Sequence, residues 1–247
     1  MAEAHASEDT AKPSCVLFLI GPQLSPNGGP PRPCLILNKR SNRVRQPGDL
    51  CCPGGGMTPR VDPVLARLLG LPLSPLTRWP AWRRWRHECP TEARQLALRL
   101  ATAVRESLEE MRLNPFRIRF LGPLAPQRLV MFRRVIYPMA GWLPRQRRFY
   151  PNWEVEKIVS VPLKNFLSEK NYCRYRLSLP AYLPRNISPR LDDFPCFVHR
   201  SPEGTEILWG ATFRIVSAFL KEVFDFTPPE MNGLPVITRR LDESYYG

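Results

Sequence analysis

Apolar and polar residues follow two different periods along this chain. Short apolar runs bounded by Pro, Gly, Asn or Ser are typical of β-strands. They occur at residues 15–21, 34–39, 50–52, 116–121, 129–142, 157–161, 174–182 and 194–199. Two longer stretches, 91–112 and 209–226, carry apolar residues at the i, i+3, i+4 spacing of an amphipathic helix. The pattern predicts an α+β protein in which helices sandwich a mixed β-sheet.

The predicted helix at 91–112 has recognisable ends and one apolar face. Thr91 can cap its start, Glu92 suits the first turn, and Asn114-Pro115 stops it. The apolar face is formed by Leu96, Ala97, Leu100, Val104, Leu108 and Met111. Burial of this face is expected to anchor the helix to the core, so that its polar face projects from a rigid element.

Residues 57–90 differ in composition from the rest of the chain. They are rich in Pro and Arg, and Trp79, Trp82 and Trp85 are spaced by three. We interpret them as an insertion within one domain at 14–226, between a flexible leader at 1–13 and a loosely ordered tail at 227–247. The insertion could be an apolar flap whose tryptophans pack on the sheet or on a partner. It could also stack on single-stranded RNA or form an adenine platform.

The charge of the chain indicates an anionic partner. Its 247 residues include 36 Lys and Arg against 22 Asp and Glu, a formal net charge of +14. That balance favours a phosphorylated small molecule, a nucleic acid or an anionic membrane surface. No apolar run is long enough to span a bilayer, and the seven cysteines include no C-x-x-C pair. We therefore expect a cytoplasmic protein, and its oligomeric state stays open.

A cluster of carboxylates lies on the first predicted helix, in Arg105-Glu106-Ser107-Leu108-Glu109-Glu110. At 100° per residue, its three glutamates fall within an arc of about 100°. Side chains with only oxygen donors select hard cations such as Mg²⁺ or Mn²⁺, which serve phosphate chemistry. The alternative is a solvated charged helix face.

Other residues could complete such a site. Gly54 and Gly55, in a predicted Pro-Gly-Gly-Gly turn, could offer bare backbone atoms to a ligand. Arg40 and Arg43 precede that turn, and a guanidinium suits bidentate phosphate recognition. Glu154 lies just before a predicted strand, where the alternative is an exposed loop carboxylate.

These motifs resemble the Nudix hydrolases, whose general pattern is G-x5-E-x7-R-E-U-x-E-E-x-G-U with U aliphatic. Gly55 and the Arg105–Glu110 cluster look like the two halves of that pattern. Flanking segments are similar to the signature of coenzyme A pyrophosphatases. They are Leu-Asn-Lys-Arg-Ser at 37–41, Gly-Asp-Leu-Cys-Cys-Pro-Gly-Gly at 48–55, and the shorter motifs at 153–156, 161–163, 175–177 and 209–212.

The resemblance implies a Nudix-type α/β/α sandwich with a long insertion between the glycine turn and the carboxylate helix. It implies that Glu106, Glu109 and Glu110, with the Gly55 carbonyl, hold Mg²⁺ or Mn²⁺, and that Arg105 fixes a glutamate. Glu154 would be an extra ligand or the base for the attacking water. The implied reaction splits coenzyme A or acyl-coenzyme A into 3′-phospho-AMP and a 4′-phosphopantetheine product.

The chain also departs from that pattern. Counting back from Arg105 places Ala97 where the pattern has its first glutamate, and 49 residues separate Gly55 from Arg105. Glu88 or Glu92 could replace the missing glutamate. Arg112 stands at the position of the last glycine. These departures support a second hypothesis, a Nudix-fold binding module that has lost catalysis and holds RNA or another polyanion.

Overall fold

The computed structural model describes residues 12–23, 30–129, 134–144, 148–178 and 193–240. Most of the predicted leader, the end of the predicted tail, and parts of the predicted strands at 129–142 and 174–182 lie outside these residues. The chain divides into two compact units: unit 1 is 1–21 with 53–150, and unit 2 is 22–52 with 151–247.

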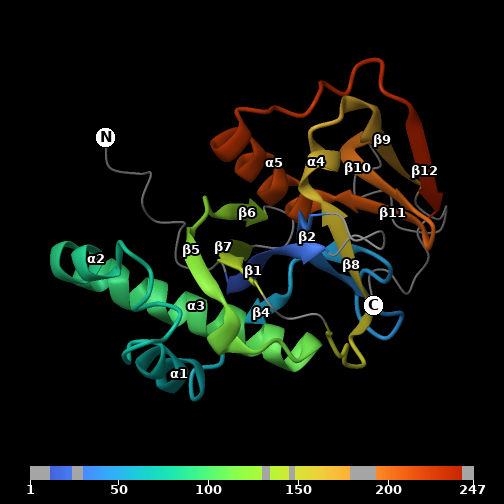
Figure 1. Ribbon diagram of the computed structural model, residues 1–247. Helices are drawn as coiled ribbons and strands as arrows, with labels where there is room; N and C mark the ends of the chain where they lie inside the picture. Colours follow the sequence, from blue (N-terminus) through green and yellow to red (C-terminus); the bar gives the residue numbers. More distant parts are fainter. Residues whose placement is uncertain (1–11, 24–29, 130–133, 145–147, 179–192, 241–247) are drawn as a thin grey trace, which may run out of the picture. The chain divides into compact units, whose positions relative to one another are not determined.

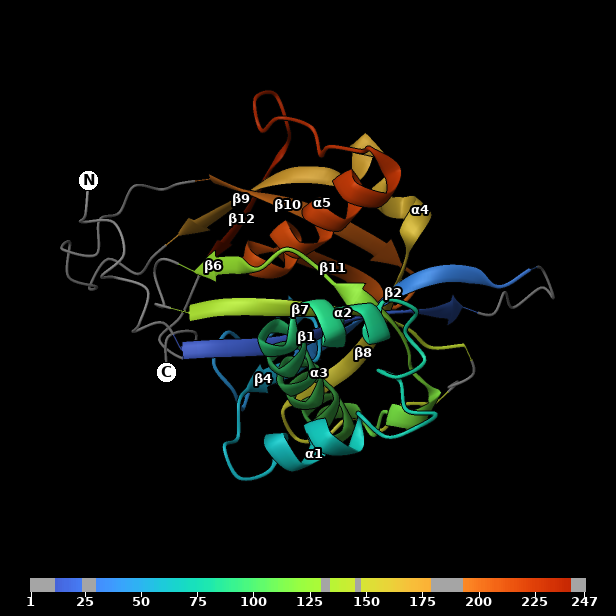
Figure 2. The ribbon, with the colours of Figure 1, turned by 90° about the vertical axis from the view of Figure 1, so that its left-hand side faces the viewer.

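The sheet of unit 1 is built around a buried central strand. Strand β1 (Lys12–Gln23) pairs in parallel with β7 (Arg134–Trp142), and the two run side by side in Figure 2. β1 also pairs antiparallel with β4 (Gly54–Gly56). Two further strands, β5 (Arg119–Pro123) and β6 (Gln127–Leu129), pair antiparallel with β7. Residues 15–20 of β1 are buried, as their continuous apolar run predicts for a central strand.

The helices of unit 1 are α1 (Asp62–Leu68), α2 (Trp82–Glu88), α3 (Pro90–Met111) and the short η1 (Pro115–Arg117). Both α1 and α2 pack on α3 (Figure 1). The predicted helix at 91–112 is confirmed as α3. It begins one residue early, at Pro90, with Cys89 rather than Thr91 as its N-cap. Proline suits this first position because it has no N–H to leave unpaired.

Unit 2 contains two separate groups of paired strands. In the first, β2 (Arg32–Arg40) pairs antiparallel with both β3 (Leu50–Cys51) and β8 (Val155–Pro162). The second has the order β11-β10-β9-β12. Its strands are β9 (Tyr172–Ser178), β10 (Asp193–Ser201), β11 (Gly204–Trp209) and β12 (Val236–Arg240). The helices are α4 (Leu163–Phe166), η3 (Glu169–Asn171) and α5 (Gly210–Phe224).

The mixture of parallel and antiparallel pairs with few helices confirms the α+β prediction. The predicted helix at 209–226 is α5, which packs on β10 and β11 (Figure 1). The single strand predicted at 129–142 was wrong, since β6 and β7 are two strands that pair antiparallel. Three further strands were not predicted. The glycine turn is strand β4, β11 precedes α5, and β12 lies within the predicted tail and pairs in parallel with β9. No helix in the described part of the chain is long and apolar enough to cross a membrane.

The insertion packs into unit 1. Trp82 is buried, and Trp79 makes edge-to-face contacts with Trp85 and with Phe120 of β5. Leu76 of the insertion is fully buried as well. These contacts favour the packed flap over a stacking surface for bases, because the tryptophan rings already contact other rings of the same unit.

Trp82 tests how much the insertion contributes to stability. Trp82→Ala is expected to lower the free energy of unfolding by about 3–5 kcal/mol, because it removes a buried aromatic side chain. Trp82→Phe is expected to cost much less, since the indole Nε1 has no hydrogen-bond partner among the described residues. Urea denaturation followed by circular dichroism measures both. Arg83→Ala, at an exposed neighbouring position, is the control, and an equal effect there would contradict the expectation.

Candidate functional site

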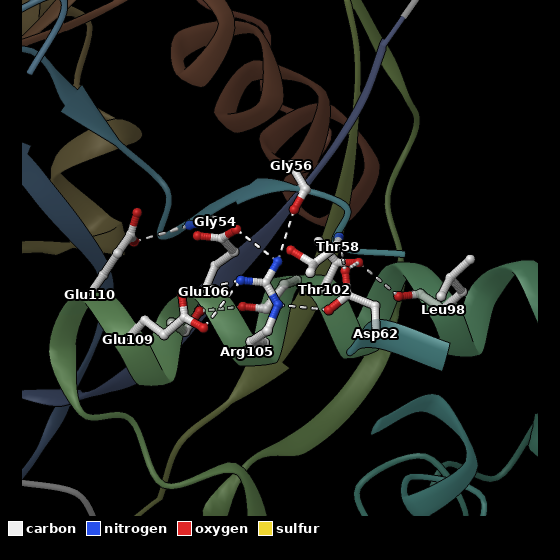
Figure 3. Close-up of polar contacts among 12 residues, drawn as sticks. Gly54, Gly56, Thr58, Asp62, Leu98, Thr102, Arg105, Glu106, Glu109 and Glu110 are labelled. Atoms are coloured by element: carbon white, nitrogen blue, oxygen red, sulfur yellow. Dashed lines mark hydrogen bonds and ion pairs between the residues drawn. The ribbon is translucent and has the colours of Figure 1, made fainter. Parts of the chain in front are cut away.

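Arg105 lies at the centre of the acidic cluster, and α3 positions it (Figure 3). Its Nε donates to Oδ1 of Asp62 at 2.7 Å. Its Nη1 donates to both carboxylate oxygens of Glu109, at 3.1 and 3.2 Å. Its Nη2 donates to Oε1 of Glu106 and to the carbonyl of Gly56, both at 2.9 Å. One guanidinium therefore joins the helix, the glycine strand and α1.

Asp62 is the residue that sequence reasoning missed. It is the first residue of α1 and is fully buried. Its Oδ2 accepts hydrogen bonds from the Thr58 backbone N–H at 2.7 Å and from the Thr102 hydroxyl at 2.8 Å. A buried carboxylate is tolerated when it is paired and hydrogen-bonded, and both conditions hold here.

The protonation of this pair follows from its contacts. Burial alone would raise the pKa of Asp62, but the hydrogen bonds from Arg105, Thr58 and Thr102 outweigh it and hold that pKa below its ordinary value. Burial likewise disfavours the charged form of Arg105, yet the bond to Asp62 and the charge of Glu106 raise its pKa. Both side chains are therefore charged at neutral pH.

The position of Asp62 accounts for the missing first glutamate. Five residues separate Gly56 from Asp62, which is the glycine-to-glutamate interval of the pattern that the chain resembles. Counting forward from the glycines would have found Asp62, whereas counting back from Arg105 crossed the insertion and reached Ala97. The two candidates from sequence do not contact Arg105: Glu88 pairs with Arg84, and Glu92 is exposed in the first turn of α3.

The glycines of β4 let the helix and the sheet approach closely. A Cβ on Gly54, whose φ is +149°, would lie 2.4 Å from the Cys15 carbonyl oxygen. A Cβ on Gly55 would lie 2.7 Å from the carboxyl carbon of Glu106. The Gly54 N–H donates to Oε2 of Glu110 at 3.1 Å. A side chain at Gly55 would therefore displace Glu106, and a side chain at Gly54 would meet the backbone of β1.

Cys15 lies under this contact, paired with Gly55 across the sheet. Burial raises the pKa of its thiol to about 12. The thiol is therefore neutral at physiological pH, and it adds no negative charge beneath the glutamates.

The repulsion among the three glutamates is relieved within the protein. Arg105 contacts Glu106 and Glu109 directly, and Glu110 accepts a hydrogen bond from the backbone. In the described residues, no three Asp, Glu, His or Cys side chains surround a point where a metal ion could sit. The donors are all oxygens on successive turns of one helix, which is the ligand type that Mg²⁺ or Mn²⁺ takes.

Arg112 also departs from the pattern in residue type but not in conformation. It is the C-cap of α3, with φ +55° in the left-handed region. Glycine is favoured in that conformation because it has no Cβ. The backbone there has the shape that a glycine would adopt, although the residue is an arginine.

The remaining predicted site residues belong to unit 2. Glu154 is half-buried, and its carbonyl accepts the Ser41 backbone N–H at 2.8 Å. Arg40 is half-buried, with its Nε donating to the Arg45 carbonyl at 2.7 Å, whereas Arg43 is exposed. This backbone hydrogen bond joins the segment that carries Arg40 and Arg43 to the segment that carries Glu154. The predicted roles of Arg40, Arg43 and Glu154 in phosphate binding and catalysis stay predictions.

Comparison with known proteins gives only distant similarity. No family model matches the chain, and no curated protein matches its sequence. A Nudix hydrolase structure from Nitrosomonas europaea is 13% identical with a TM-score of 0.41, covering 92% of this chain and 80% of that one. The C. elegans Ap4A hydrolase in a binary complex is 11% identical with a TM-score of 0.39, covering 63% and 82%.

A third similar structure is the NUDIX domain of Shewanella oneidensis NrtR complexed with ADP ribose. It is 15% identical with a TM-score of 0.37, covering 64% of this chain and 76% of that one. All three TM-scores are below 0.5, so the likeness carries no argument on function.

The three glycines of β4 form a matched series for mutation. Gly54→Ala is expected to lower the free energy of unfolding by about 1–3 kcal/mol or more, because the new Cβ meets backbone atoms. Gly55→Ala is expected to fold but to displace the Glu106 carboxylate, which is the end of a flexible side chain. Gly56→Ala is the control, since its Cβ would enter open space. Thermal unfolding ranks the three, and equal stability of the Gly54 and Gly56 variants would contradict the close packing of β4.

Asp62 is expected to make stability depend on acid. The pKa of Asp62 is lower in the folded state than in the unfolded state. Its contribution to the free energy of unfolding is therefore complete above the ordinary carboxyl pKa of about 4, and it is lost as pH falls through the folded-state pKa. Asp62→Asn is expected to lower the free energy of unfolding by about 3–5 kcal/mol at pH 7. The variant should also lose part of the acid dependence. Denaturant unfolding between pH 3 and pH 7 measures both, and a wild-type profile in the variant would refute this role.

Proposed function

We propose that this protein is a Nudix-type diphosphatase that hydrolyses a nucleoside diphosphate-linked substrate with the help of a divalent metal ion. The observation that carries the proposal is the docking of the carboxylate helix on the glycine strand. Arg105 contacts Gly56, Glu110 contacts Gly54, and Glu106 reaches the bare Cα of Gly55. These contacts bring together both halves of the motif that the sequence separates by 49 residues.

The proposed metal ligands are Glu106, Glu109, Glu110 and the Gly55 carbonyl. Mg²⁺ or Mn²⁺ bound there would neutralise the diphosphate and activate a water molecule. Arg105 and Asp62 act as positioning residues: Asp62 holds the guanidinium, and the guanidinium holds the glutamates. The Gly54 N–H donates to Oε2 of Glu110 and so orients that carboxylate beside the glycine strand.

Coenzyme A or an acyl-coenzyme A is the substrate we propose, with 3′-phospho-AMP and 4′-phosphopantetheine as the products. Its support is the sequence resemblance of residues 37–41 and 48–55 to coenzyme A pyrophosphatases. The net charge of +14 suits such an anionic substrate. We assign phosphate binding to Arg40 and Arg43, and a metal-ligand or base role to Glu154.

A product assay tests the proposal. Purified protein with Mg²⁺ or Mn²⁺ should release 3′-phospho-AMP from coenzyme A faster than it cleaves NADH, ADP-ribose or dinucleoside polyphosphates. Glu109→Gln and Glu110→Gln should each lower kcat by at least about 10²-fold, the loss that follows removal of one group stabilising charge in the transition state. Glu92→Gln, on the exposed first turn of the same helix, is the control. The absence of turnover on the whole panel would refute the proposed activity.

One observation favours a second candidate, a polyanion-binding module without catalysis. Arg105 pairs directly with Glu106 and Glu109 and so relieves their repulsion within the protein. A module of this kind would bind RNA in a salt-sensitive way, and its binding would survive Glu106→Gln and removal of metal. Calorimetric titration with Mn²⁺ separates the two candidates, because only the diphosphatase requires metal binding that Glu109→Gln and Glu110→Gln weaken.

A further inference from the structure

Five large aliphatic side chains are exposed within one short stretch of the insertion. Val61, Val64 and Leu68 of α1 and its N-cap are 47%, 54% and 53% exposed, and Leu71 and Leu73 in the following turn are 54% and 82% exposed. Scattered apolar residues are normal on protein surfaces, but five exposed within residues 61–73 are a local concentration of the kind that marks interaction sites. We call these five residues the aliphatic patch.

The geometry of α1 separates this patch from the residues that anchor the helix. Asp62 and Leu69 are both buried, and they fall on one side of the helix at 100° per residue. Val61, Val64 and Leu68 fall on a different side, at the i, i+3, i+7 spacing. In Figures 1 and 2, α1 lies on the side of α3 away from β1 and β7. Asp62 anchors the buried side of α1 to Arg105. The side that carries Val61, Val64 and Leu68 is therefore exposed.

Arginines border the patch. Arg67 is exposed on the flank of α1 away from Asp62, and Arg60 is exposed just before the N-cap of the helix. Residues 57–90 contain six arginines and only two acidic residues. Asp62 is paired with Arg105, and Glu88 with Arg84. Arg60 and Arg67 therefore place positive charge next to the exposed aliphatic residues of α1.

Leu73 has a conformation that its own side chain opposes. Its φ is +67°, in the left-handed region, and it is the most exposed large apolar residue in the described part of the chain. This conformation brings the Cβ of an L-residue close to backbone atoms, a strain that Gly avoids and Asn tolerates. No packing gain compensates for this cost, because the side chain is exposed. Such strain at an exposed position points to a function.

We propose that the aliphatic patch docks this protein on the surface of an anionic lipid bilayer. Val61, Val64 and Leu68, with Leu71 and Leu73, would enter the boundary between headgroups and acyl chains. Arg60 and Arg67 would contact the lipid phosphates. A helix with an apolar face bordered by arginines has this mode of binding, and the charge makes it selective for anionic lipid. The proposal is independent of the diphosphatase activity.

The composition of the patch favours a bilayer over a protein partner. Stable protein interfaces engage roughly 20–30 residues on each side, with aromatic residues enriched at their centre. The patch has five aliphatic residues and no aromatic one. A bilayer requires neither shape complementarity nor directional hydrogen bonds, so a few leucines and valines beside arginines suffice.

Vesicle sedimentation of the full chain tests the proposal. The protein should bind vesicles of phosphatidylcholine with phosphatidylglycerol, bind phosphatidylcholine alone less, and lose affinity as salt rises. The double variant Leu71→Asn/Leu73→Asn should lower the partition coefficient at least about tenfold, since burial of even one leucine side chain is worth about that factor. Leu73→Asn alone should keep or raise the thermal midpoint, because asparagine tolerates positive φ. A loss of vesicle binding in Leu73→Asn could then not be ascribed to unfolding.

Val223→Asn is the matched control, because Val223 on α5 is 54% exposed and lies outside the patch. It should bind vesicles as the wild type does. The proposal is overturned if the wild type does not sediment with anionic vesicles, or if the double variant sediments equally well. It is also overturned if light scattering detects a dimer that the double variant abolishes, since a second copy would then cover the patch.

Discussion

The buried ion pair between Arg105 and Asp62 is the interaction on which unit 1 and its candidate site both depend. It joins α3 to α1 across 43 residues of sequence. With the Nε of Arg105 held by Asp62, the two terminal nitrogens can face Glu106, Glu109 and the Gly56 carbonyl. A single fixed cation thus both stabilises the acidic cluster and orients it. Removal of Arg105 would leave the buried Asp62 carboxylate without its ion-pair partner.

The same pair gives the insertion a structural role. The insertion is fixed to α3 near its start, because α1 begins at Asp62 and Asp62 pairs with Arg105 of α3. Trp82 and Leu76 are buried in unit 1, so the insertion behaves as part of the core rather than as an appended arm. Its outward face is left for the aliphatic patch. Catalytic geometry and surface docking can therefore share one element without sharing residues.

Much of the fold was predictable because long apolar patterns are locally encoded. Helices α3 and α5 were predicted to within two residues at each end. The short strands β4, β11 and β12 were not predicted. A run of three glycines carries no apolar pattern, and β4 is a strand only because it pairs with residues 14–16 of β1. Pairing with β9 decides the conformation of β12 in the same way.

The sequence by itself determined the acidic helix face and the residues that could bind a hard cation, because residue type and helical spacing are local properties. Only the tertiary structure decided that Asp62 holds the Arg105 guanidinium and that Gly55 admits the Glu106 carboxylate at close range. Those facts depend on contacts between residues more than 40 positions apart. Spacing along the chain does not encode such contacts, since packing of the whole unit brings them about.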